Sequence, residues 1–100
     1  EMTRTLYEAL GPDTSKRAFV HYPAGTYPGQ TKDIADNTHF NPYGAYQIAK
    51  CVIEGMKKAV PELAKHLKID PAYDPAHPDD VNAFHWNESP FTEIEKPDGN

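Results

Sequence analysis

The clearest pattern of apolar and polar positions lies between residues 41 and 59. Asn41 followed by Pro42 is a strong helix start, because an N-cap asparagine accepts a backbone hydrogen bond and proline fits the first helical position. Pro61 ends or bends the helix near Ala59. The sequence therefore predicts a helix over 42–59. Its apolar residues recur at helical spacing and predict one buried stripe: Ala45, Ile48, Ala49, Val52, Ile53 and Met56.

The other side of this helix carries mostly polar residues: Tyr46, Gln47, Lys50, Glu54 and Lys57. Cys51 is the only cysteine of the chain, so no intrachain disulfide forms. It falls on the apolar side, where we expect a buried, inert thiol.

Weaker patterns predict the remaining elements. Helical residue types over 2–10 stop at Gly11-Pro12, and residues 18–22 are typical of a short strand. Proline and glycine in the segment 23–35 predict an irregular loop. A short amphipathic helix is expected over 62–67. This order is typical of the last βα unit of an α/β domain whose sheet lies mostly elsewhere, because a lone strand cannot bury itself.

Residues 69–100 are expected to form an irregular Pro/Asp-rich arm that ends in a linker. Phe84, Trp86 and Phe91 are candidates to anchor this arm on the body, and residues 92–96 are a candidate edge strand. The arm therefore adds little to any core.

Composition indicates a piece of something larger rather than an independent domain. Only 38% of the 100 residues are hydrophobic and ten are prolines, so the chain would be marginally stable alone. The net charge of −5, with no basic cluster larger than the pairs Lys16-Arg17 and Lys57-Lys58, makes nucleic acid or an anionic membrane an unsuitable partner. No apolar run is long enough to span a membrane.

Asp36 and His39 are the main candidates for chemistry. A carboxylate three residues before a histidine can accept the Nδ1 proton of the imidazole and leave Nε2 free to act as a base. A turn or capping motif with no catalytic role is the alternative interpretation. The serines of the chain are Ser15 and Ser89, and neither lies at a Gly-rich strand-to-helix turn typical of a nucleophile.

Other side chains are weaker candidates for a role in substrate binding. His21 ends the predicted strand and is either a substrate contact at the same site or a structural histidine. Tyr22, Tyr27 and Tyr43 offer apolar faces on which sugar rings can stack, although ordinary packing or surface tyrosine is the default interpretation. Gly44 allows close approach of a backbone or of substrate, or simply tolerates the helix start.

A group of acidic and histidine residues in the arm does not predict a metal site. Its spacing matches no standard zinc or calcium pattern, and a solvated acidic turn is the preferred interpretation. The residues concerned are His77, Asp79, Asp80 and His85.

The motifs around Asp36 and His39 together resemble the last conserved block of the GDSL, or SGNH, hydrolases, and specifically the rhamnogalacturonan acetylesterase-like branch. The resemblance covers roughly residues 5–67. Its motifs are Leu10-Gly11-Pro12, Phe19-Val20-His21-Tyr22-Pro23-Ala24-Gly25, Pro28-Gly29, Asp36-Asn37-Thr38-His39-Phe40, Tyr43-Gly44-Ala45 and Ala49 with Glu54-Gly55.

The resemblance implies that residues 1–68 are the C-terminal βα portion of a three-layer α/β/α, flavodoxin-like sandwich with a parallel sheet. It implies that His39 is the general base and Asp36 its orienting carboxylate, with His21, Tyr43 and Gly44 as substrate-binding candidates. The implied reaction removes acetyl esters from pectic polysaccharide with a serine nucleophile and requires no cofactor or metal. The implied location is extracellular or periplasmic.

The family's Gly-Asp-Ser nucleophile block and its two oxyanion-hole blocks do not occur in this sequence. The chain is therefore expected to be a fragment, inactive alone, whose partners are the acetylated polysaccharide and the missing N-terminal part of the same domain. Exposed apolar surface would favour self-association. Two alternatives stay open: a non-catalytic sugar- or protein-binding module, and an SGNH esterase or lipase with another ester substrate.

Overall fold

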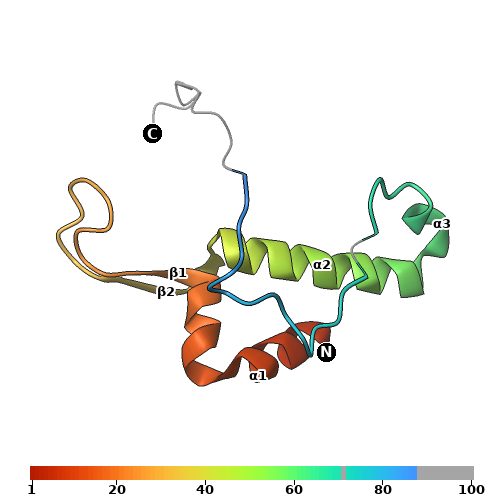
Figure 1. Ribbon diagram of the computed structural model, residues 1–100, viewed down its shortest axis with the longest axis horizontal. Helices are drawn as coiled ribbons and strands as arrows, with labels where there is room; N and C mark the ends of the chain where they lie inside the picture. Colours follow the sequence, from red (N-terminus) through yellow and green to blue (C-terminus); the bar gives the residue numbers. More distant parts are fainter. Residues whose placement is uncertain (71, 88–100) are drawn as a thin grey trace.

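The chain forms a mixed α/β structure in which a long helix is flanked by a kinked helix, a short sheet and a returning arm (Figure 1). The computed structural model describes residues 1–70 and 72–87. The elements are α1 (Met2–Thr14), the 3₁₀ helix η1 (Ser15–Ala18), β1 (Phe19–Tyr22), β2 (Ile34–Phe40), α2 (Pro42–Ala59) and α3 (Pro61–Ala64). The predicted strand over 92–96, the linker and the anchor Phe91 lie outside the described residues.

Helix α1 continues past the stop predicted at Gly11-Pro12. Gly11 has φ 79° and ψ 173°, so the helix is kinked there and resumes to Thr14. Glycine adopts this positive φ without the steric cost that a side chain would impose. The first part of α1 places Leu6 in the core.

The described residues contain one sheet, and it is antiparallel with two strands, β1 and β2. The prediction missed β2, because its sequence Ile-Ala-Asp-Asn-Thr-His-Phe is mostly polar and its residues are mostly exposed. The predicted 23–35 loop is correspondingly shorter and is tied by Gln30, whose side-chain amide donates to the carbonyls of Tyr22, Pro23 and Lys32. The expected parallel sheet stays a prediction about a longer protein.

Helix α2 runs from Pro42 to Ala59, the bounds expected from the sequence, and the Asn41 side chain accepts a hydrogen bond from the Gly44 backbone at 2.9 Å. The predicted buried face is wrong in part, because of its six residues only Ile48, Ile53 and Met56 are partly buried. Ala45, Ala49 and Val52 are exposed, the last with 64% of its surface in solvent. The buried residues of α2 are Tyr43, Gly44, Gln47 and Cys51. The thiol of Cys51 is thus buried as predicted, and burial raises its pKa.

The arm explains why the polar side of α2 is covered. From Asp70 it runs back along the helix toward its N-terminal end (Figure 1). Successive contacts join Lys57 to Asp70, Glu54 to the Tyr73 backbone, Lys50 to Asp79, and Tyr43 to the Asp79 carbonyl.

The core is small for the length of the chain. Its fully or nearly buried apolar residues in the described part are Leu6, Ala18, Tyr43 and Cys51. The radius of gyration is 16.4 Å, whereas a compact domain of this length has about 13 Å. The chain is therefore less compact than an independent domain of the same length.

Candidate active site

Asp36 and His39 lie on a bulge of β2. Val20 pairs with Asp36 and its neighbour Phe19 pairs with Phe40, so residues 37–39 have no partner on β1. Bulges of this kind redirect side chains away from a sheet and are common beside active sites. The bulge presents His39 at the surface, just before α2 begins.

The Asp36 carboxylate holds this bulge together. Its Oδ1 accepts hydrogen bonds from the backbone N–H groups of Thr38 at 2.6 Å and His39 at 3.0 Å. Its Oδ2 accepts the ring Nδ1–H of His39 at 2.6 Å. Since a carboxylate only accepts, this contact fixes the tautomer with the proton on Nδ1 and the lone pair on Nε2.

The electrostatics of the pair favour the ionised carboxylate. The two backbone hydrogen bonds, with that from the imidazole, lower the pKa of Asp36 from its ordinary 3.8 to about 2. The Asp36 side chain is 32% exposed and the His39 side chain 77% exposed. Among residues 1–70 and 72–87, none forms a hydrogen bond with the Nε2 atom of His39. The pair can therefore accept a proton from an incoming group.

A second pair with the same spacing occurs in the arm. The Nδ1–H of His77 donates to Oδ2 of Asp74 at 2.8 Å, and Oδ1 of Asp74 accepts the Ala76 backbone N–H. Both side chains are well exposed. Hydrogen bonding within an Asp-x-x-His segment therefore does not by itself define a catalytic pair. What distinguishes Asp36 and His39 is their position on the bulge of β2.

The other predicted site residues lie beside the bulge or beneath it. The Nε2–H of His21 donates to the Asn37 side-chain carbonyl at 2.6 Å, so His21 contacts the bulge itself. Tyr43 is buried and its hydroxyl donates to the Asp79 carbonyl at 2.7 Å. Gly44 is buried against Ala18, where an added Cβ would overlap the carbonyl group. The close approach at Gly44 is thus that of a backbone.

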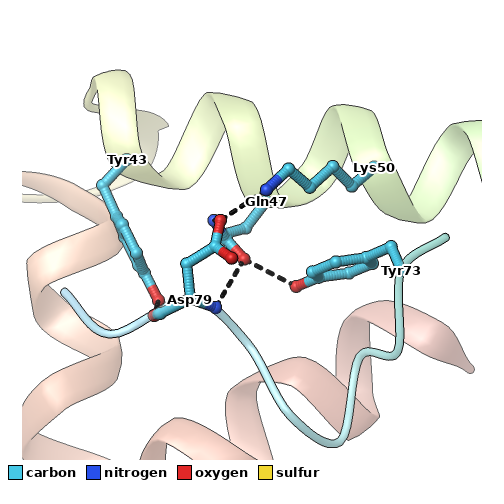
Figure 2. A network of polar contacts seen from close by, with 5 residues as sticks. All are labelled: Tyr43, Gln47, Lys50, Tyr73 and Asp79. Atoms are coloured by element: carbon cyan, nitrogen blue, oxygen red, sulfur yellow. Dashed lines mark hydrogen bonds and ion pairs between the residues drawn. The ribbon is translucent and has the colours of Figure 1, made fainter. Parts of the chain in front are cut away.

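A polar network under the arm has no counterpart in the sequence-based interpretation (Figure 2). Gln47 is fully buried; its amide nitrogen donates to Asp79 Oδ2, and its carbonyl accepts the Tyr73 hydroxyl and the Asp79 backbone N–H. Lys50 forms an ion pair with the same carboxylate. Burial raises the pKa of Asp79, but the bonds from Lys50 and Gln47 outweigh it and the pKa is lowered overall. Asp79 is therefore only partly solvated, with 39% of its side chain exposed, whereas His77 and Asp80 of the predicted acidic turn are exposed. No spacing rule would have indicated Gln47 as the partner of Asp79.

No serine or cysteine of the described residues forms a hydrogen bond with His39. The Ser15 hydroxyl donates to the Pro12 carbonyl, and Ser89 lies outside the described residues. Within the same residues, no cluster of three metal-ligating side chains occurs. None of the helices described is both long and apolar enough to cross a membrane.

A base–carboxylate pair on a mixed α/β frame is a feature of esterases and related hydrolases. Over 65 residues, 65% of the chain, the sequence is 45% identical to rhamnogalacturonan acetylesterase RhgT of Bacillus subtilis (strain 168). The chain spans 28% of the length of that protein. No family model and no solved structure matches the chain. The chain is thus related, over about two thirds of its length, to a protein named as an esterase.

Proposed function

We propose that this chain is the C-terminal part of a secreted SGNH-type serine esterase that removes acetyl groups from pectic polysaccharide. His39 is its general base and Asp36 the carboxylate that orients the imidazole. The observation that carries the proposal is the bulge of β2, in which Asp36 binds both the backbone and the Nδ1–H of His39 and leaves the ring exposed. The similarity to a named acetylesterase supports the choice of reaction.

In the proposed reaction, Nε2 of His39 takes the proton of a serine hydroxyl as the serine oxygen attacks the acetyl carbonyl. The ionised Asp36 stabilises the imidazolium that results. His39 then gives the proton to the departing sugar oxygen, and the acetyl group stays on the serine. Water, activated by the same Nε2, releases acetate and restores the serine.

The serine and the oxyanion-hole donors are proposed to lie in a preceding part of the domain. A solvent-facing apolar strip on α2 supports this division, because Ala45, Ala49 and Val52 follow one another at helical spacing and are all exposed. A further layer of a three-layer sandwich would bury this strip. Without the nucleophile no acyl-enzyme forms, so the isolated chain is expected to be inactive.

The test compares two histidines in the full-length protein. His39→Ala is expected to lower the rate of acetate release from acetylated pectin by about 10³-fold or more, because base and acid functions are both lost. His77→Ala removes an imidazole held by the same Asp-x-x-His geometry and is the matched control. It should leave the rate unchanged.

Equal rates for wild type and His39→Ala would contradict the proposal and favour the non-catalytic binding module. His39-dependent turnover by the isolated 100-residue chain would contradict the placement of the nucleophile outside it. Activity on lipid esters but not on acetylated pectin would replace the proposed substrate.

A further inference from the structure

A pocket of about 300 Å³ lies where the arm meets β1 and the start of α2. Its wall on the body includes Arg17, His21 and Asn41, and its wall on the arm includes Phe84 and Trp86. The volume lies at the lower end of the range for small-molecule sites. Two of these residues also connect it to the proposed active site: His21 donates to Asn37 in the bulge, and Asn41 follows the bulge two residues after His39.

The arm wall of the pocket is held in place by several independent contacts. Deeper in the structure, the network around Gln47 and Asp79 fixes the arm on α2 (Figure 2). Nearer the pocket, Phe84 packs edge-on against Tyr43 at 5.3 Å between ring centroids. These contacts set the pocket shape before any ligand binds, which reduces the entropic cost of binding.

Arg17 gives the pocket a fixed cation. One guanidinium nitrogen donates to the Asn82 side chain of the arm at 2.7 Å, and the Arg17 carbonyl accepts the Asn41 amide at 2.6 Å. No carboxylate of the described residues forms a salt bridge with Arg17. The nearby Asp79 is paired with Lys50, and Asp80 accepts the Asn82 backbone N–H. The remaining guanidinium donors are suited to a ligand carboxylate, which arginine binds with two parallel hydrogen bonds.

The aromatic residues give the pocket a second preference. Tyr22, Phe84 and Trp86 line it together with the polar groups of His21 and Asn41. Aromatic faces pack against the apolar C–H face of a sugar ring. The Nε2–H of His21 donates to Asn37, which leaves its Nδ1 as an acceptor for a sugar hydroxyl. A cation, aromatic faces and a hydroxyl-binding imidazole in one pocket match a sugar that bears a carboxylate.

We infer that this pocket, framed by Arg17 and Trp86, is a binding subsite for one hexuronate residue of an acidic polysaccharide. The inference rests on the proposed function, because only that function indicates that the ligand is a polymer. The subsite would hold the chain beside the bulge, with the uronate carboxylate on Arg17 and the ring against Trp86. The arm would then be a part of the binding surface rather than a mere extension.

Binding of unacetylated trigalacturonate to the full-length protein tests the inference by NMR, with the Trp86 indole signal as the reporter. The matched ligand is the same oligomer with its carboxylates reduced to alcohols. Arg17→Gln is expected to weaken trigalacturonate binding about tenfold, since a charge-assisted pair is lost. Lys16→Gln removes the same charge one residue away, where the lysine pairs with Asp13, and should leave the affinity unchanged.

Equal affinity for the two oligomers, equal loss in the two variants, or no saturable binding up to about 10 mM would overturn the inference. If Arg17→Gln does not fold, Arg17→Lys decides the question. It keeps the charge and loses the planar fork, so binding should weaken, and an unchanged affinity would contradict the assignment. The oligomer carries no ester, so a failed esterase assay would leave the binding result standing.

Discussion

At the scale of single residues, the Asp36 carboxylate has two roles: it orients the His39 imidazole and it stabilises the backbone of the bulge. One oxygen closes the bulge through two backbone N–H groups while the other holds the imidazole. Asp74 in the arm makes one fewer backbone contact and lies in a more exposed setting. The difference between the two Asp-x-x-His segments is therefore one of backbone anchoring, which determines how firmly the imidazole is oriented.

This anchoring predicts how the bulge responds to acid. The pKa of Asp36 is lowered to about 2 in the folded chain from 3.8, so ionised Asp36 contributes stability that is present above pH 3.8 and is lost as the pH falls through about 2. The Thr38 and His39 amide signals in NMR spectra should titrate near pH 2. Asp36→Asn should remove this titration, and a midpoint near 3.8 would show that the backbone contacts are weak.

At the scale of elements, the start of α2 determines where the bulge and the pocket lie. Asn41 caps the helix through the Gly44 backbone, and its amide nitrogen donates to the carbonyls of Arg17 and Phe19. Gly44 then packs directly on Ala18. One asparagine and one glycine thus join α2 to the segment that precedes β1.

Two glycines of α2 give a matched test of this packing. Gly44→Ala should lower the free energy of unfolding by about 3 kcal/mol, because the new methyl group overlaps a backbone carbonyl that cannot move freely. Gly55→Ala should raise it by up to about 1 kcal/mol through helix propensity, since its Cβ would meet only the flexible end of Met2 at 3.2 Å. Urea unfolding monitored by circular dichroism measures both. Similar values for the two variants would contradict the packing argument.

The elements also show what the sequence could predict. Local signals, the Asn41-Pro42 start and the Pro61 stop, gave the bounds of α2. Strand β2 was missed because its pairing with β1 is a tertiary contact that its polar sequence does not encode by alternation. The prediction of the buried face of α2 was wrong in part for a related reason: the arm covers Gln47 with polar partners, while Val52 stays exposed.

At the scale of the whole molecule, the described residues have two different surfaces. The arm covers one side of α2 through polar contacts, whereas the apolar strip of Ala45, Ala49 and Val52 is exposed. A complete domain of this class would bury the open strip, so its exposure agrees with the small core and with the proposed missing layer. The position of His39 and Asp36 was predictable from local spacing, but the pocket was not, because it joins segments that lie far apart in the sequence.

The fixed position of the arm depends most on Gln47, and its replacement tests the architecture as a whole. Gln47→Met keeps the volume but leaves the Tyr73 hydroxyl and the Asp79 N–H without their acceptor, which should cost about 2–3 kcal/mol of unfolding free energy. Hydrogen exchange should accelerate at Asp79, and Trp86 fluorescence should report the loosened pocket wall.

Gln30→Met makes the same chemical change in the β1–β2 turn, where the glutamine binds backbone carbonyls. This control should leave exchange at Asp79 unaltered, because the turn makes no hydrogen bond to the arm among the described residues. If both variants accelerate exchange at Asp79 equally, the arm is held by general stability rather than by the Gln47 network. A selective effect of Gln47→Met would mean that one buried amide fixes the position of the arm on α2. The same amide would then also fix the arm wall of the proposed uronate subsite.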